Sequence, residues 1–136
     1  MATRGYSGTP LANKLSLKDG QRVWWQDMPD SVRAEIEQAG FALDLLPAPE
    51  APIEAAHIFV TERADLEEAV GRLLPLLAPA GFLWVSWPKK ASKVSTDITE
   101  DVIRDVILPL GLVDVKVCAV DAIWSALKLM IRRSRR

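Results

Sequence analysis

The stretch VDVKVCAVDAIWSALKLMI, residues 113–131, decides the fold that this sequence predicts. Residues 113–120 and 123–131 are both rich in apolar and β-branched side chains, and we predict that both are strands. Only Asp121 and Ala122 separate them. Parallel neighbours need a crossover of about a dozen residues or more, so this short link predicts an antiparallel hairpin.

Upstream of the hairpin, predicted strands alternate with predicted helices. The run FLWVSW at 82–87 is almost wholly apolar, which is typical of a central strand covered on both faces. This alternation predicts an α/β, Rossmann-like fold, with a mostly parallel sheet of about six strands that ends in the antiparallel hairpin. In chain order, the predicted elements before the hairpin are helix 9–17, strand 22–26, helix 29–38, strand 41–46, strand 57–60, a helix with an apolar stripe over 66–77, strand 82–87 and a helix after residue 97.

Three side chains are predicted to cap these helices. Thr9 precedes the first helix, and Thr61 precedes the helix with the apolar stripe. Asp97 stands three residues before Glu100, which is the spacing of a capping box. Each capping oxygen would accept a hydrogen bond from a backbone amide in the first turn.

The composition is that of one ordinary globular domain. The 136 residues are 49% apolar and 26% charged, and the formal net charge is −1. We expect a single domain over 1–136, with an N-terminal arm at 1–20 that carries the short helix and a basic tail at 132–136. A near-neutral chain creates no field that attracts nucleic acid or an anionic membrane, so we expect neither as a partner.

Cysteine usage and hydropathy favour a cytoplasmic location. Cys118 is the only cysteine, so no internal disulfide can form. The first ten residues, MATRGYSGTP, contain no apolar stretch of the secretory kind. The longest uncharged stretch, 73–88, is interrupted by prolines and is too short to span a membrane. The oligomeric state is left open.

Three stretches carry a resemblance to a bacterial family of unknown function, and the resemblance covers nearly the whole chain. They are GYSGTPLANKL at 5–15, LWVSWPKKASKVSTDITEDVIRD at 83–105 and GLVDVKVCAVDAIWSALK at 111–128. The resemblance implies a bacterial, cytoplasmic protein and no known activity. The order of strands and helices is also similar to a class I methyltransferase core that lacks about one βα unit.

The resemblance to methyltransferases implies a site for S-adenosylmethionine, but both usual parts of that site are missing from the sequence. In such folds a glycine-rich loop follows the first strand, and an acidic residue ends the second. Here the loop at 26–31 reads QDMPDS, and the second strand ends Leu45-Leu46-Pro47. We therefore predict no cofactor, and the sequence argues against S-adenosylmethionine in particular.

The loop after strand 82–87 is the candidate binding site. It leaves the carboxyl end of a central strand and leads into a helix, a place where open α/β sheets collect ligands and where helix amides favour anions. Its lysines and hydroxyls would bind a small anion such as a phosphate or a carboxylate. The predicted ligand-binding residues are Lys89, Lys90, Ser92, Lys93, Ser95 and Thr96, with Trp87 at the mouth of the loop. The alternative is a solvated loop whose helix is already capped by Asp97.

No catalytic or metal-binding residue is assigned from the sequence. His57, the only histidine, is placed at the start of a strand, and Cys118 is expected to be a small buried apolar group. Asp27 and Glu62 follow the first and third strands and could form an acid–base pair, although Glu62 also suits the first turn of a helix. A Ser-His-Asp arrangement assembled in space stays open.

The leading functional hypothesis is a non-catalytic, methyltransferase-like binding or interaction module with an anionic ligand at 89–96. The alternative is an enzyme, either a divergent S-adenosylmethionine-dependent methyltransferase or another small transferase. A third hypothesis is oligomerisation through the edge of the terminal hairpin. The cleft between the first and third strands distinguishes the first two hypotheses, because an enzyme should keep a ligand-sized pocket with convergent polar groups there.

Overall fold

A six-stranded sheet forms the centre of the computed structural model, which describes residues 8–136. Its strands are β1 (Arg22–Gln26), β2 (Asp44–Leu45), β3 (Ile53–Phe59), β4 (Leu77–Pro88), β5 (Leu112–Ala119) and β6 (Trp124–Ile131). The helices are α1 (Leu11–Lys14), α2 (Asp30–Glu37), α3 (Arg63–Leu73) and α4 (Glu100–Ile107), with 3₁₀ turns at Leu74–Leu76, Lys90–Ser92, Leu108–Leu110 and Arg133–Arg135. Residues 1–7, which begin the predicted arm and the GYSGTPL motif, lie outside the described residues.

The strand directions confirm the predicted fold class. The order across the sheet is β2-β1-β3-β4-β6-β5, and β2, β1, β3 and β4 run parallel to one another. The terminal hairpin then adds β6 antiparallel to β4, and β5 antiparallel to β6. Asp121 shapes the hairpin turn, since its Oδ1 accepts hydrogen bonds from the amides of Ile123 and Trp124, both at 2.8 Å.

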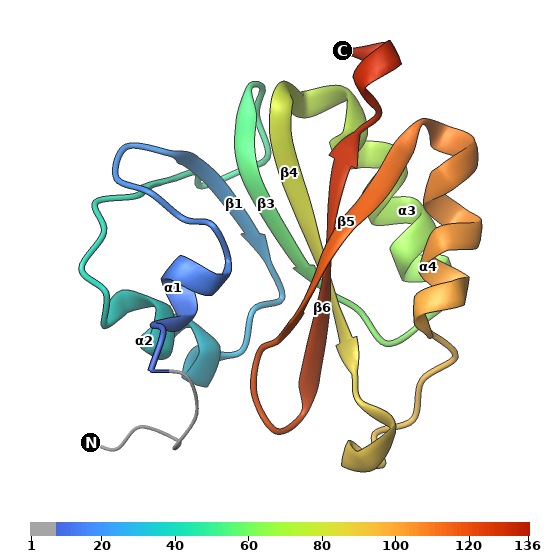
Figure 1. The fold of residues 1–136 in the computed structure, drawn as a ribbon, viewed down its shortest axis with the longest axis horizontal. Coiled ribbons are helices and arrows are strands. Elements are labelled where there is room, and N and C mark those ends of the chain that lie inside the picture. Colours follow the sequence, from blue (N-terminus) through green and yellow to red (C-terminus); the bar gives the residue numbers. More distant parts are fainter. Residues whose placement is uncertain (1–7) are drawn as a thin grey trace.

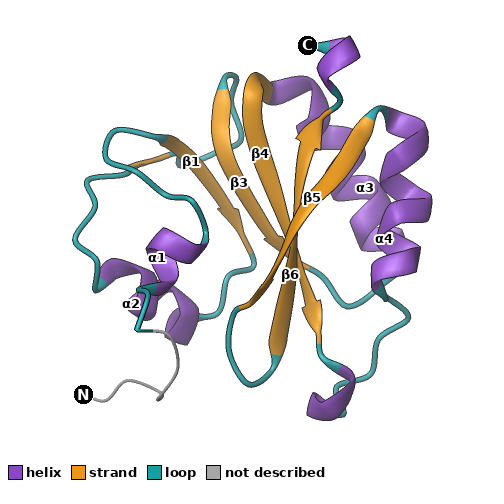
Figure 2. Cartoon of the chain, viewed as in Figure 1, coloured by secondary structure: helices purple, strands orange, loops and turns teal. Residues whose placement is uncertain are grey.

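Helices cover both faces of the sheet and create two apolar cores (Figures 1 and 2). On one face, α3 and α4 pack against strand residues such as Ile58, Leu83 and Leu127. On the other face, α1 and α2 pack against residues such as Val23 and Trp84. Neighbouring side chains on a strand point to opposite faces, so each strand contributes to both cores.

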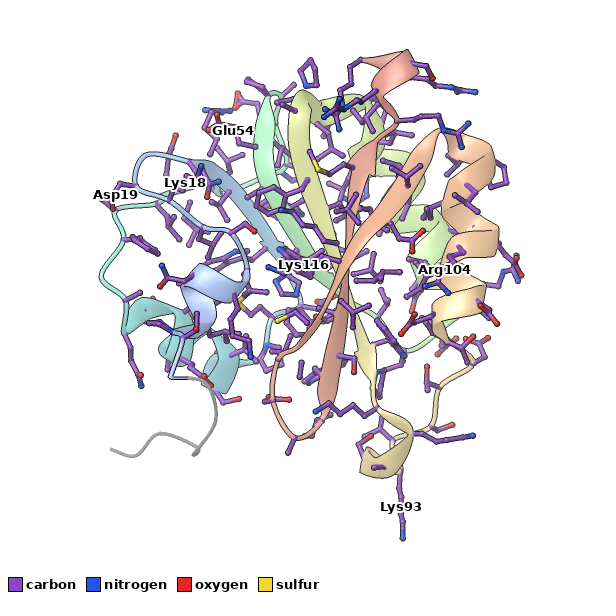
Figure 3. All side chains as sticks on the ribbon, in the orientation of Figure 1. Lys18, Asp19, Glu54, Lys93, Arg104 and Lys116 are labelled. Carbon is purple, nitrogen blue, oxygen red and sulfur yellow. The ribbon has the colours of Figure 1, made fainter. Side chains whose placement is uncertain are left out.

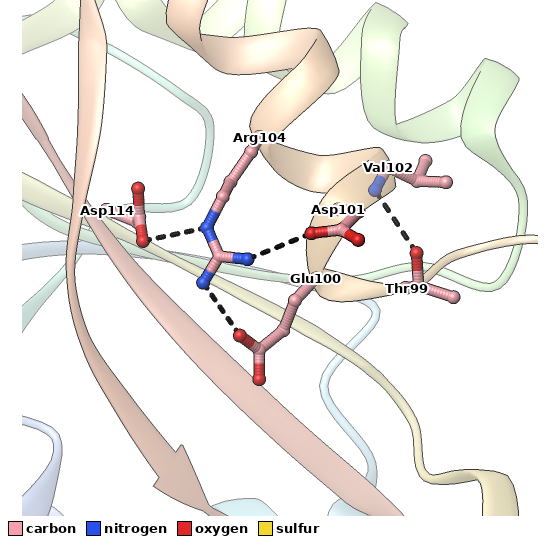
Figure 4. Close-up of polar contacts among 6 residues, drawn as sticks. All are labelled: Thr99, Glu100, Asp101, Val102, Arg104 and Asp114. Atoms are coloured by element: carbon pink, nitrogen blue, oxygen red, sulfur yellow. Dashed lines mark hydrogen bonds and ion pairs between the residues drawn. The ribbon is translucent and has the colours of Figure 1, made fainter.

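The helix ends differ from the predicted caps. Pro10 and Glu62 are the N-cap residues of α1 and α3 without side-chain capping bonds, so Thr9 and Thr61 were the wrong choices. Thr99, not Asp97, caps α4, and its Oγ1 accepts a hydrogen bond from the Val102 amide at 3.2 Å (Figure 4). Asp97 lies too far upstream for that role.

Asp97 and Thr96 instead connect the loop after β4 to the start of α3. Asp97 Oδ1 accepts a hydrogen bond from the Arg63 amide at 2.7 Å, at the first residue of α3. Thr96 Oγ1 donates to the carbonyl of Thr61 at 2.6 Å. The capping function predicted for Asp97 therefore exists, but it serves the neighbouring helix.

An ion-pair cluster holds α4 against the edge of the sheet. The guanidinium of Arg104 pairs with Asp114 on β5 at 3.0 Å, and with Glu100 at 2.8 Å and Asp101 at 3.2 Å in the first turn of α4 (Figure 4). Hydrogen bonds to Asp114 and Glu100 raise the pKa of Arg104 above its ordinary value. The cluster fixes which side of α4 faces β5.

Three strands differ in length from the prediction. β2 has only two residues instead of 41–46, and both are exposed. β3 begins at Ile53 rather than His57, and β4 begins at Leu77 rather than Phe82. A register shift between β3 and β4 accommodates Pro79 and Gly81, and a Cβ on Gly81 would lie 2.8 Å from the Ile53 carbonyl oxygen. Only glycine allows this approach, because the obstacle is backbone.

The basic tail 132–136 forms a 3₁₀ turn beyond the end of β6 (Figure 1). The Arg132 amide donates to the Gly111 carbonyl at 2.8 Å, and Arg136 Nε donates to the Ile131 carbonyl at 2.8 Å. None of the helices among residues 8–136 is long and apolar enough to cross a membrane.

Candidate functional site

The topology marks one position on the sheet as the natural ligand site. After β1 the chain forms β2 on one side of β1, and then β3 on the other side. In open α/β sheets such a reversal leaves a crevice at the carboxyl ends of the two central strands, where ligands bind. Here that crevice lies between the ends of β1 and β3.

A hollow of about 410 Å³ occupies this crevice. This volume lies within the usual range for small-molecule sites, roughly 300–1,000 Å³. The lining residues come from the ends of β1 and β3, from α3 and from the start of β6: Gln26, Asp27, Phe59, Val60, Thr61, Asp65, Glu68 and Trp124. The hollow therefore has the size of a small-molecule site, and its lining combines polar and aromatic side chains.

Acidic side chains dominate the polar part of the hollow. Asp27 follows β1 directly, and Asp65 and Glu68 project from α3. The guanidinium of Arg72 binds Glu68 at 3.0 Å and the side-chain oxygen of Gln26 at 2.8 Å, which ties α3 to the end of β1. With Asp27 and Asp65 on its wall, the hollow favours a ligand that carries positive charge.

Asp27 has an unusual backbone conformation for a residue with a side chain. Its φ is +58°, in the left-handed region that glycine adopts most easily. Aspartate tolerates this region better than most residues, because its short side chain can interact locally with the backbone. The chain thus makes a sharp turn after β1 without a glycine.

Aromatic rings form the apolar wall of the hollow. Phe59 and Trp124 contact each other edge to face, with ring centroids 5.1 Å apart and an interplanar angle of 82°. Behind them, His57 stacks on Phe59 with a centroid distance of 4.5 Å. This support orders the two rings that border the hollow.

His57 is buried in the middle of β3, not at its start. Its Nε2 and Ser86 Oγ share a hydrogen bond of 2.7 Å, and both side chains are inaccessible to solvent. Burial lowers the pKa of His57 from 6.5 to about 3. A neutral, enclosed imidazole of this kind is structural, and it does not face the hollow.

Cys118 is also a packing residue, as the sequence predicts. Its side chain is buried in the core beneath α1 and α2. Burial raises the pKa of the thiol, which opposes formation of the nucleophilic thiolate. In the part of the chain that the structure describes, no group of three or more His, Cys, Asp or Glu side chains is placed to hold a metal ion.

The loop at 89–96 follows the carboxyl end of β4, at the same edge of the sheet as the hollow, but none of its residues lines the hollow. Ser92 Oγ donates to the Lys89 carbonyl within the loop at 2.6 Å, and Thr96 Oγ1 donates to the carbonyl of Thr61 beside the hollow. Lys90, Lys93 and Ser95 are exposed, and Lys93 extends away from the protein (Figure 3). The Trp87 ring is only 8% exposed and belongs to the core beneath α3 and α4. Anion binding by this loop stays a prediction.

Comparison with solved structures establishes what the chain is similar to. A structure described as the complex between the Haloferax volcanii Trm112 methyltransferase activator and the putative methyltransferase superposes with a TM-score of 0.62 at 9% identity, over 89% of this chain and 86% of that one. The fold is methyltransferase-like. A SAM-dependent methyltransferase from Aquifex aeolicus gives a TM-score of 0.60 at 13% identity, over 89% and 87% of the two chains. LepI in complex with SAM gives 0.56 at 10% identity, and this chain spans 50% of its length.

Comparisons of sequence, unlike those of structure, found no match. No family model matches the chain, and no curated protein matches it. The methyltransferase-like part of the predicted resemblance is thus confirmed by structure, whereas the bacterial family of unknown function finds no support in these comparisons.

The prediction of no cofactor is contradicted by the same structures. It relied on the missing glycine-rich loop and on the absence of an acidic residue after β2. Yet the proteins that share this methyltransferase-like fold include one solved with SAM and one described as SAM-dependent. The physical reason for the error is that Asp27 provides the positive φ at the end of β1, so a sharp turn there does not require glycine.

Proposed function

We propose that this chain is a divergent methyltransferase-like protein that binds S-adenosylmethionine in the hollow between the ends of β1 and β3. The observation that carries the proposal is the hollow itself. A ligand-sized, acidic and aromatic site lies at the switch point of the sheet.

The charge of the site suits this cofactor. S-adenosylmethionine has a positively charged sulfonium, an ammonium group and one carboxylate, so it is net positive, and Asp27 and Asp65 supply negative charge on the wall of the hollow. The arrangement would discriminate against anionic nucleotides, whose phosphates the same carboxylates repel.

The aromatic wall suits the rest of the molecule. Trp124 and Phe59 present ring surface on which an adenine can pack, and a ring is also attractive to a sulfonium cation. When bound, the cofactor would supply an electrophilic methyl group. The chain itself would bind and orient it, with the carboxylates at the cationic end and the rings along the apolar part.

Calorimetric titration of the protein with S-adenosylmethionine tests this assignment. The Asp27→Asn/Asp65→Asn double variant should weaken binding roughly tenfold, because two favourable charge interactions are lost. Trp124→Leu should weaken it by a similar factor, about tenfold, because stacking on the ring is lost. Glu67→Gln is the matched control, since Glu67 lies on the same helix, pairs with Arg63 and does not line the hollow.

Two results would contradict the proposal. One is the absence of binding to the wild-type protein at ~1 mM cofactor, a level that detects even weak sites. The other is that the double variant and Trp124→Leu bind the cofactor as strongly as the control variant Glu67→Gln does.

A further inference from the structure

A second hollow, of about 310 Å³, lies on the face of the sheet that carries α1. It is at the opposite edge from the proposed cofactor site, beside the turn that joins α1 to β1 and the first part of β4. The residues used below are Ser16, Lys18, Glu54, Phe82, Lys128 and Met130. α1 packs over Trp84 on β4, whose indole donates a hydrogen bond to the Leu15 carbonyl at 2.9 Å. On the same face of the sheet, β6 lies next to β4, and β5 lies next to β6.

Two lysines face each other directly on this part of the sheet, on β5 and β6. Lys116 on β5 and Lys128 on β6 are cross-strand partners in the antiparallel hairpin. Side chains at such positions share one face of the sheet and lie close together, so like charges there are destabilising. Among residues 8–136, no carboxylate forms an ion pair with either of them or with Lys18. The fold therefore concentrates positive charge here without neutralising it.

The Lys128 ammonium is held in place and partly removed from water. Its Nζ donates to Ser16 Oγ at 3.0 Å and lies 4.5 Å from the centre of the Phe82 ring. Burial, together with repulsion from Lys116 and Lys18, lowers the pKa of Lys128. These three lysines therefore interact as a group, although they are far apart in the sequence.

Positive charge outweighs negative charge in the lining of the hollow. Lys18 and Lys128 stand against one carboxylate, Glu54, which accepts a hydrogen bond from the Arg22 amide at 2.8 Å. Phe82 and Met130 provide an apolar floor next to the ammonium groups. Figure 3 labels Lys18, which precedes β1, and Lys116 on β5.

We propose that Lys18, Lys116 and Lys128 form a binding site for a small molecule that carries a phosphate or pyrophosphate group. The anion neutralises the paired lysines, and the apolar part of the molecule rests on Phe82 and Met130. A small ligand is favoured over a nucleic acid because Lys18 and Lys128 line a compact hollow rather than a long track, with Lys116 beside Lys128 on the neighbouring strand, and because the chain has a net charge of −1. The site does not depend on the proposed cofactor site.

Titration with inorganic pyrophosphate at constant ionic strength tests the proposal by two measurements, calorimetry and amide chemical shifts in ¹⁵N-labelled protein. We expect the shifts to change around Ser16, Lys18, Lys116 and Lys128. Lys128→Gln and Lys116→Gln should each weaken binding roughly tenfold or more, since a charge-assisted contact is lost. Lys93→Gln, in the loop at the other edge, is the matched control and should bind like the wild type.

The Lys116→Glu variant adds a test that does not depend on weak binding. It converts the repulsive pair into an attractive cross-strand ion pair, so the melting temperature should rise in anion-free buffer and no longer respond to pyrophosphate. Three outcomes would overturn the proposal: no binding of pyrophosphate to the wild type, unchanged binding in the glutamine variants, or shifts confined to residues 89–96.

Discussion

Acidification should destabilise this protein through His57, and the size of the effect follows from the burial of that residue. The pKa of His57 is lowered from 6.5 to about 3 in the folded protein, whereas the unfolded chain keeps the ordinary value. Below pH 6.5 the imidazole therefore binds a proton in the unfolded state but stays neutral in the folded state. The free energy of unfolding falls as the pH falls. At ~1.4 kcal/mol per pH unit, the loss is about 2 kcal/mol at pH 5 and approaches 4–5 kcal/mol near pH 3.

Urea unfolding between pH 5 and 7 measures this loss of stability in a window where few other groups change their protonation. His57 is the only histidine, so no second imidazole titrates in this window. Carboxylic acids ordinarily have pKa values of about 4, below this window. A loss of about 2 kcal/mol is large for a small domain, whose total stability is usually about 5–15 kcal/mol.

The variant His57→Gln separates this cause from others. It keeps a hydrogen-bonding group beside Ser86 Oγ but removes the titration. Its free energy of unfolding should be nearly constant from pH 5 to 7. A wild-type protein that is equally stable at pH 5 and 7, or a glutamine variant that keeps the full slope, would refute the reasoning.

Three further substitutions test the cap of α4 and the space around two glycines, and urea unfolding checks all of them. Thr99→Ala should lower the free energy of unfolding by about 1 kcal/mol, because the Val102 amide at the start of α4 loses its acceptor; Thr99→Ser should restore it. Gly81→Ala should destabilise the protein, because its new Cβ would lie 2.8 Å from the Ile53 carbonyl oxygen. Gly71→Ala, in the exposed interior of α3 with open space around it, should instead stabilise it by up to ~1 kcal/mol. Equal effects of the two glycine substitutions would contradict the argument from close approach.

Sequence predicted the parts of the fold that depend on short-range chemistry. The hairpin followed from the two residues between its predicted strands, and the alternation of strands and helices followed from apolar periodicity. The strand at 41–46 was overestimated because its apolar residues are only partly used in the sheet. Phe41 and Leu43 pack against the α1–α2 core, and pairing with β1 involves only Asp44 and Leu45.

The candidate sites were harder to predict, because they depend on which strands become neighbours. Asp27 was singled out from its place after β1, but Asp65 and Trp124 join it only through the strand order β1-β3-β4-β6. In the same way, Lys116 and Lys128 look like ordinary surface residues until the register of the hairpin places them opposite each other. Register and strand order are tertiary properties that local periodicity does not encode.

The position of β6 has a consequence for the order in which the molecule can fold. β6 follows β5 in the chain, yet it lies between β4 and β5 and is the sole strand with which β5 pairs in the described sheet. Pairing among β1, β2, β3 and β4 does not involve β6. β5 must wait until its later partner has been made, so this half of the sheet, with the facing lysines, is completed last.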